Sequence, residues 1–164
     1  MRVSPVALWA RSEAETLDLA KKSAQVTHNH PEGIAGAQAT ALAIWLARQG
    51  LKSADIRQEI QSRFQYDLSR SVDEIRPNYA FDVTCAGSVP QALSCALEAT
   101  SFEDAIRNAI SIGGDSDTIA SIAGGYAEVA FGVPDKIVQE VRARLNDELL
   151  QVIDLFYARL EQRF

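Results

Sequence analysis

Apolar residues recur at steps of three and four along almost the whole chain of 164 residues, while alternation of apolar and polar residues is nearly absent. Steps of three and four place side chains on one face of an α-helix, whereas a half-buried strand needs a step of two. Residues 78–88 have some strand character, but no second stretch could pair with them, so we expect an extended loop there. The pattern therefore predicts an all-α fold.

Capping residues and prolines predict where the first helices begin and end. Ser12 and Glu15 fit a capping box. The helix that follows them should stop before Pro31, because a residue that precedes proline avoids the helical region. Pro31 should open a second helix that runs to Gln49, with Gly50 as its left-handed stop. This second helix is rich in alanine and glycine, which let neighbouring backbones approach closely, so we place it at the centre of the fold.

Further helix starts follow from the same signals. Four serines are predicted to cap helices: Ser53, Ser71, Ser88 and Ser101. The last of these helices should bury Ala105, Ile106, Ala109 and Ile110. Gly113 and Gly114 should end it, and Asp115 should begin the next helix. Pro134 is expected to open a single long final helix. With no internal repeat or linker in the sequence, residues 1–164 are predicted to form one domain.

Charge and composition argue against several classes of protein. The chain has 16 Lys and Arg against 22 Asp and Glu, a net charge of −6, whereas nucleic-acid binding needs an excess of basic residues. No stretch approaches the roughly 20 apolar residues of a membrane span. The first residues do not form a secretory signal, and Cys85 and Cys95 are too few for a disulfide framework. We therefore expect a cytoplasmic protein with no nucleic-acid or membrane partner.

The densest polar cluster is residues 113–118, GGDSDT. Two carboxylates two residues apart, followed by a hydroxyl, supply the oxygen ligands that Mg²⁺ prefers. Alternatively, Asp115 caps the helix while Ser116 and Asp117 only occupy its first turn, and the spacing alone favours this second interpretation.

A second cluster, residues 27–32 (THNHPE), lies where two helices should meet. One of its imidazoles could contact a sugar or a phosphate, or transfer a proton. The alternative is a turn whose histidines are simply hydrogen-bonded and solvated. The pair lacks matching cysteines for a zinc site. Cys85 has no base beside it in the sequence, which argues against a catalytic thiol.

Three stretches of this sequence resemble the ADP-ribosylglycohydrolase family. Residues 101–132, SFEDAIRNAISIGGDSDTIASIAGGYAEVAFG, closely resemble the C-terminal signature of that family. Residues 27–37 are similar to a segment in the middle of the family domain, through Thr27, His28, Pro31, Gly33, Gly36 and Ala37. Residues 1–6, MRVSPV, are similar to the end of its substrate loop. The three stretches occur in the family's order and extend over most of the chain.

The resemblance implies a compact, orthogonal bundle of helices that holds two Mg²⁺ or Mn²⁺ ions. It also implies hydrolysis of the bond between ADP-ribose and a protein side chain or a small molecule. By the same resemblance, Asp115 and Asp117 are catalytic residues and, with Thr118, metal ligands. The residues expected to bind the substrate are His28, Ser116, Met1 and Arg2.

The chain also departs from the family pattern, because family members carry a further N-terminal half with a Glu and a Thr-Asp-Asp run that help to bind metal. This sequence has no Asp-Asp dipeptide and begins inside the substrate loop, so it resembles an N-terminally truncated member. Three interpretations stay open: a metal-dependent hydrolase, a non-catalytic domain that binds ADP-ribose or a partner, and a piece of a longer enzyme. Without the N-terminal helices, apolar faces should lie bare, so we expect self-association or pairing with an N-terminal segment.

Overall fold

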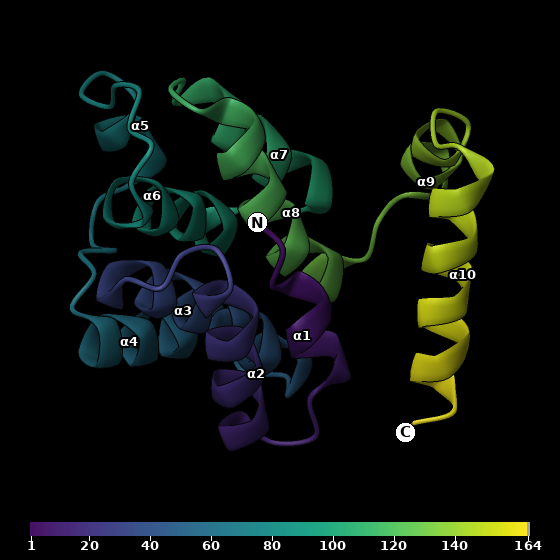
Figure 1. Ribbon diagram of the computed structural model, residues 1–164. Coiled ribbons are helices and arrows are strands. Elements are labelled where there is room, and N and C mark those ends of the chain that lie inside the picture. The colour runs from purple at the N-terminus through teal and green to yellow at the C-terminus, as the bar shows by residue number, and fades with distance from the viewer. Residues whose placement is uncertain (164) are drawn as a thin grey trace. The chain divides into compact units, whose positions relative to one another are not determined.

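The computed structural model describes residues 1–163, which form ten helices and no strand (Figure 1). The all-α prediction is therefore confirmed. Within these residues, no helix is long and apolar enough to cross a bilayer. The chain divides into two compact units, Met1–Gly132 and Val133–Phe164, which are described separately. The single domain expected over residues 1–164 stays a prediction.

Helices α1 to α8 belong to the first unit, and α9 and α10 belong to the second. The first unit contains α1 (Ser4–Trp9), α2 (Glu13–Gln25), α3 (Pro31–Arg48), α4 (Ser53–Phe64), α5 (Val72–Ile75), α6 (Cys85–Glu98), α7 (Phe102–Ser111) and α8 (Ser116–Phe131). The second unit contains α9 (Asp135–Arg142) and α10 (Asp147–Glu161).

Helix α3 is the central element of the first unit, as its small side chains predicted. It packs against α1, α2, α4, α6 and α8. Its middle turn is buried on all sides, because Ala41, Leu42, Ala43 and Ile44 have no exposed surface. A helix that is apolar all round is typical of a core position. Gly36 brings α3 and α6 close together, because a Cβ atom at this position would lie 3.1 Å from the Cβ of Cys85.

Several predicted caps are present. The Ser12 hydroxyl accepts the backbone N–H of Glu15 at the start of α2, but the Glu15 carboxylate accepts the N–H of Arg11, so this capping box is not reciprocal. Ser71 and Glu74 form a complete capping box on α5. Ser101 caps α7 as expected.

Two predicted caps are wrong. Helix α6 begins at Cys85 with Thr84 as its cap, whereas Ser88 was expected to hold that position. The Thr84 hydroxyl accepts the Gly87 N–H at 3.0 Å, and Ser88 is buried inside the helix, where it donates to the Asp82 carbonyl at 2.9 Å. Lys52 holds the N-cap position of α4 without a side-chain cap, and the expected cap, Ser53, is the first residue of the helix. The buried face expected of α7 also needs correction, since Ile110 is 56% exposed.

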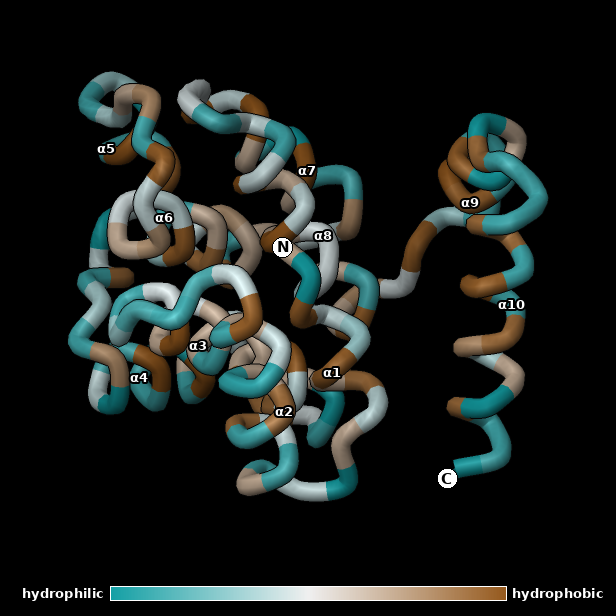
Figure 2. Tube along the Cα trace, in the orientation of Figure 1, coloured by the Kyte–Doolittle hydropathy of each residue, from teal (hydrophilic) through white to brown (hydrophobic). Residues whose placement is uncertain are grey.

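The single final helix that was expected from Pro134 is two helices. The break falls at residues 143–146, where the Asn146 side chain accepts the Leu149 N–H at 2.9 Å and starts α10. The Arg142 guanidinium donates two hydrogen bonds to the Asp154 carboxylate, at 2.9 and 3.1 Å, and so ties α9 to α10. Neither helix of this hairpin contains a buried residue, and apolar residues recur along both (Figure 2).

A diglycine turn joins α7 to α8 and adopts a conformation that other residues rarely take. Gly113 and Gly114 have φ angles of +76° and +68°. A Cβ atom on Gly114 would lie 2.5 Å from the Tyr79 ring, whereas a Cβ atom on Gly113 would meet nothing within 4 Å. The loop before α6 therefore packs tightly against this turn.

Helix α1 is anchored to α3 through one side chain. The half-buried Arg48 guanidinium donates to the carbonyl oxygens of Ala7, Leu8 and Ala10, at 3.3, 2.8 and 2.9 Å. These carbonyls lie at the C-terminal end of α1, where a helix leaves its acceptors unsatisfied. Arg48 therefore fixes the segment that carries Met1 and Arg2.

Replacing Arg48 should therefore destabilise the first unit. Arg48→Met leaves these carbonyls without their charged donor, and we expect the free energy of unfolding to fall by about 1–3 kcal/mol. Urea denaturation followed by circular dichroism measures the change. The matched control is Arg107→Met, which removes only an exposed ion pair with Glu103 and should change stability by less than about 0.5 kcal/mol. Equal effects of the two substitutions would contradict the anchoring role.

The diglycine turn yields a second prediction. Gly113→Ala should cost about 1 kcal/mol, because it adds only the strain of an alanine at positive φ. Gly114→Ala adds a collision with Tyr79 to that strain, so we expect a loss of about 2–3 kcal/mol. Equilibrium unfolding of the two variants separates the collision from the strain, and indistinguishable stabilities would argue against close packing of Tyr79 on the turn.

Candidate functional site

A cavity of about 360 Å³ lies in the first unit, where α2, α3, α6 and α8 meet beside the N-terminal residues. Its lining comes from segments that are far apart in the sequence. The residues that line it are Met1, Arg2, Val3, Ala24, His28, Gly33, Gly36, Ala37, Thr40, Val83, Thr84, Cys85, Ser88, Val89, Asp115, Thr118 and Ile122.

Asp115 and Thr118 bring the start of α8 to this cavity. They are three residues apart, which places both side chains on one face of a helical turn. Asp115 is the N-cap residue of α8, yet no hydrogen bond joins its side chain to the first turn of that helix, all of which is described. Asp115 therefore holds the N-cap position expected by the capping alternative, but without a side-chain cap. Asp115 also lines the cavity.

Ser116 and Asp117 do not belong to the described lining. Asp117 is exposed, and its pKa is lowered by a hydrogen bond with the Asp115 carboxyl and then by hydrogen bonds from the backbone N–H groups at the start of α8. The Ser116 hydroxyl donates only a long hydrogen bond, 3.5 Å, to the Gly114 carbonyl.

The two histidines of the second cluster have different environments. His28 lines the cavity, and its Nδ1 shares a 2.7 Å hydrogen bond with the Thr27 hydroxyl, which leaves Nε2 for another partner. His30 accepts the Glu32 N–H at 3.3 Å and acts as the cap of α3. Gly33 permits this turn, because a Cβ atom there would lie 2.8 Å from the His28 carbonyl oxygen.

Met1 and Arg2 line the cavity from the segment before α1. Arg2 is exposed and brings a positive charge to the cavity. Ser4 packs instead against α8, where a Cβ atom on Gly125 would lie 2.2 Å from the Ser4 hydroxyl oxygen. Close packing of α1 on α8 therefore holds the N-terminal residues beside the cavity.

Several lining residues were not identified from the sequence. Gly33, Gly36, Ala37 and Thr40 follow the spacing i, i+3, i+4 and i+7, so they form one face of α3. This spacing can be seen in the sequence. Small residues at this spacing also pack helices together, so the spacing does not by itself indicate a cavity. Thr84, Cys85 and Ser88 were missed because the start of α6 was expected at Ser88.

The start of α8 can supply part of a metal-binding shell. Its donors are the carboxylates of Asp115 and Asp117 and the hydroxyl of Thr118, the hard oxygen ligands that Mg²⁺ and Mn²⁺ accept. In the part of the chain that the structure describes, no three His, Cys, Asp or Glu side chains are grouped to hold an ion. These donors could fill part of the coordination shell of a divalent ion. The remaining ligands would have to come from water, substrate or another segment.

Comparison with known proteins places these observations in a family. The sequence model of the ADP-ribosylglycohydrolase family matches residues 1–164. A protein of Archaeoglobus fulgidus is 26% identical over 160 residues, which cover 88% of this chain and 52% of that protein. The ADP-ribosylhydrolase ARH3 of Danio rerio is 26% identical and that of Homo sapiens 27% identical, each over 81% of this chain and 48% and 49% of their own lengths.

The chain thus spans about half the length of the relatives that it matches. The match of the family model to all 164 residues agrees with the all-helical fold and with the resemblance seen in the sequence. The chain belongs to the ADP-ribosylglycohydrolase family.

Proposed function

We propose that this protein hydrolyses the N- or O-glycosidic bond between ADP-ribose and a protein side chain or a small molecule, in a reaction that depends on Mg²⁺ or Mn²⁺. One observation carries the proposal: Asp115, Thr118, His28 and Arg2 come from three separate segments and line a single cavity. The ARH3 relatives are ADP-ribosylhydrolases, which agrees with this substrate class.

Asp115, Asp117 and Thr118 would hold the divalent ion. When bound, the ion supplies Lewis-acid chemistry, which polarises an oxygen and stabilises developing negative charge. The freedom of the Asp115 carboxylate from capping supports this role, because a carboxylate already bonded to the α8 backbone would be a poorer ligand. Ser116, beside both carboxylates in sequence, would lie at the edge of the metal and substrate site.

The other side chains would bind and orient the substrate. The Arg2 guanidinium is suited to the diphosphate, because it carries a fixed positive charge and several donors. His28 would offer Nε2 to a ribose or phosphate oxygen while Thr27 holds its other nitrogen, and Met1, which lines the same cavity, would contact the ribose. Hydrolysis adds water at the anomeric carbon, breaks the bond to the leaving nitrogen or oxygen, and transfers a proton to that atom.

Substitution of the carboxylates tests the metal-dependent site. Asp115→Asn and Asp117→Asn should each weaken Mg²⁺-dependent binding of ADP-ribose at least about tenfold, because a charged ligand is lost. Isothermal titration calorimetry with and without Mg²⁺ measures this. Asp135→Asn, the same change in the first turn of α9, should leave the affinity unchanged. If ADP-ribose binds the three variants alike, the assignment of this site is wrong.

A second candidate function is binding of ADP-ribose without cleavage. It is favoured by the absence of a third grouped His, Cys, Asp or Glu in the described residues, because a hydrolytic metal site usually draws on more ligands. Release of ADP-ribose from a modified peptide, followed by chromatography at substrate excess, separates the two functions. Turnover that is lost in Asp115→Asn supports hydrolysis, whereas Mg²⁺-dependent binding without turnover supports the binding domain.

We also propose that the protein self-associates or pairs with an N-terminal segment through the hairpin of α9 and α10. Three apolar side chains of the hairpin are exposed, Val141 and Leu155 by 51% and Val152 by 64%. Exposed apolar side chains that gather into a patch are typical of interfaces. Both thiols, Cys85 and Cys95, are free, which is compatible with the reducing cytoplasm expected from the sequence.

Light scattering tests the self-association. The protein should have a mass above the 17.9 kDa of one chain, and Val152→Asp should shift it towards the monomer by placing a charge in the interface. Gln151→Asp makes the same change of charge at the neighbouring position and should keep the larger mass. A monomer at all concentrations, with the hairpin helices intact by circular dichroism, would contradict self-association.

A further inference from the structure

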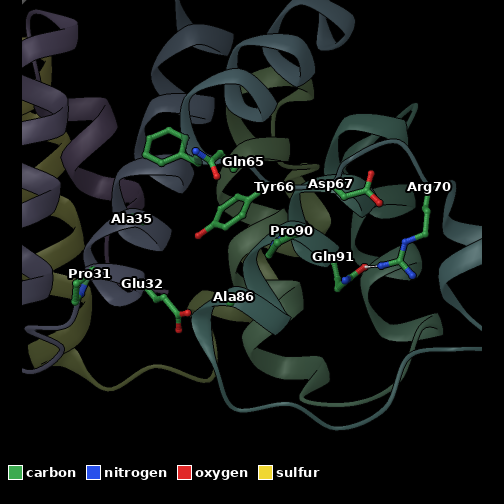
Figure 3. Close-up of a pocket in the computed structure, with 11 residues that line it drawn as sticks. Pro31, Glu32, Ala35, Gln65, Tyr66, Asp67, Arg70, Ala86, Pro90 and Gln91 are labelled. Carbon is green, nitrogen blue, oxygen red and sulfur yellow. Dashed lines mark hydrogen bonds between the residues drawn. The ribbon is translucent and has the colours of Figure 1, made fainter.

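A second cavity, of about 520 Å³, opens on different faces of α3 and α6 from those that line the first cavity (Figure 3). Of the described residues that line the two cavities, none is shared. On α3, Glu32 and Ala35 face the second cavity, whereas Gly33 and Gly36 face the first. The segment that follows α4 forms another wall of the second cavity, through residues 64–67 and Arg70.

This segment is held in place by its own hydrogen bonds. Gln65, the C-cap residue of α4, adopts the left-handed conformation, with φ of 57°, and turns the chain sharply before Tyr66. The Asp67 carboxylate then accepts hydrogen bonds from both the N–H and the hydroxyl of Ser69, at 3.0 and 2.6 Å. Gln61 accepts the Leu68 N–H at 3.1 Å. The cavity wall is thus preformed.

Aromatic rings give the second cavity an apolar surface. The rings of Phe64 and Tyr66 are stacked, with centroids 6.2 Å apart and an interplanar angle of 27°. Pro31, Ala35 and Pro90 add further apolar surface. The Tyr66 hydroxyl is buried and has no hydrogen-bond partner among the described residues. Burial, with smaller contributions from Cys85 and Glu32, raises the pKa of Tyr66 to about 12, so the phenol stays neutral at physiological pH.

Of the charged side chains around the Tyr66 ring, the Arg70 guanidinium has an opposite charge nearby, whereas the carboxylate of Glu32 has no ion-pair partner among the described residues. Tyr66 lies between Glu32 on one side and Arg70 with Gln91 on the other (Figure 3). The Arg70 guanidinium donates to the Gln91 side chain at 3.5 Å. Hydrogen bonds from Ser69, and to a smaller extent the charge of Arg70, lower the pKa of Asp67, so Arg70 has a carboxylate nearby. Glu32 forms no ion pair with any described residue.

We propose that the second cavity binds the guanidinium or ammonium side chain of a polypeptide, stacked on the Tyr66 ring with Glu32 as its counter-ion. An aromatic face attracts an organic cation through the quadrupole of the ring, and a carboxylate on the same cavity supplies the opposite charge. The prolines and alanine would cover the aliphatic stem of an arginine or lysine, as such stems pack on apolar surface while the charge stays solvated. The net charge of −6 favours approach of a basic partner. The proposal concerns binding alone and does not depend on hydrolysis.

Nuclear magnetic resonance with a short peptide tests this proposal directly. The peptide acetyl-Gly-Arg-Gly-amide, titrated into the ¹⁵N-labelled protein, should shift the amide signals of residues 32–35, 64–67, 86–89 and Gln91. The matched peptide with citrulline in place of arginine has the same shape without the charge and should shift them at least about threefold less at equal concentration. Acetyl-Gly-Lys-Gly-amide should act at the same amides.

Two variants and a control assign the site. Glu32→Gln and Tyr66→Leu should each weaken arginine-peptide binding about threefold or more, because one removes the counter-ion and the other the aromatic face. Glu103→Gln makes the same charge change on α7, which does not contribute to the described lining, and should leave the affinity unchanged. The exposed Glu32→Gln variant keeps the test independent of any misfolding of Tyr66→Leu.

Three results would overturn the proposal. The first is an equal response to the arginine and citrulline peptides. The second is an unchanged affinity in a folded Glu32→Gln variant. The third is binding of free L-argininamide as tight as that of the peptide, which would indicate a site for a small cation rather than for a polypeptide side chain.

Discussion

The close approach of α3 to its neighbours is the constraint on which the rest of this structure depends. Gly36 lets the backbone of α3 come near α6, and Gly33 lets the start of α3 pass beside the His28 carbonyl. Larger side chains at either position would push the helices apart and move the residues that line the first cavity. The small residues of α3 therefore serve packing and site geometry together, because close-packed interiors transmit any change in volume to their surroundings.

The diglycine turn is the second determinant of the site. Its positive φ angles turn the chain sharply between α7 and α8, and Tyr79 fills the space beside Gly114 that a side chain would need. Asp115 follows this turn as the N-cap residue of α8, and its side chain forms no cap hydrogen bond. The pKa of Asp117 is lowered by a hydrogen bond with Asp115 and then by the first N–H groups of α8, which favour negative charge nearby.

Much of the fold could be predicted from the sequence, because caps and apolar spacing are local signals. Ser12, Ser71 and Ser101 cap helices as expected. The start of α6 was missed because Thr84 and Ser88 are both acceptable caps. In the structure Thr84 accepts the Gly87 N–H, whereas Ser88 donates to the Asp82 carbonyl. The cavity itself could not be predicted, because residues distant in the sequence line it and a single sequence carries no direct information on which of them meet.

The α3–α6 contact means that a ligand in one cavity can change the affinity of the other cavity for its ligand. Each helix presents one face to the first cavity and another to the second, so the two pockets are separated by the same pair of helices. A molecule that shifts these helices on one side alters the shape available on the other. Thermodynamic linkage makes such an effect reciprocal: if occupancy of one pocket changes the affinity of the other by some factor, the reverse change has the same factor.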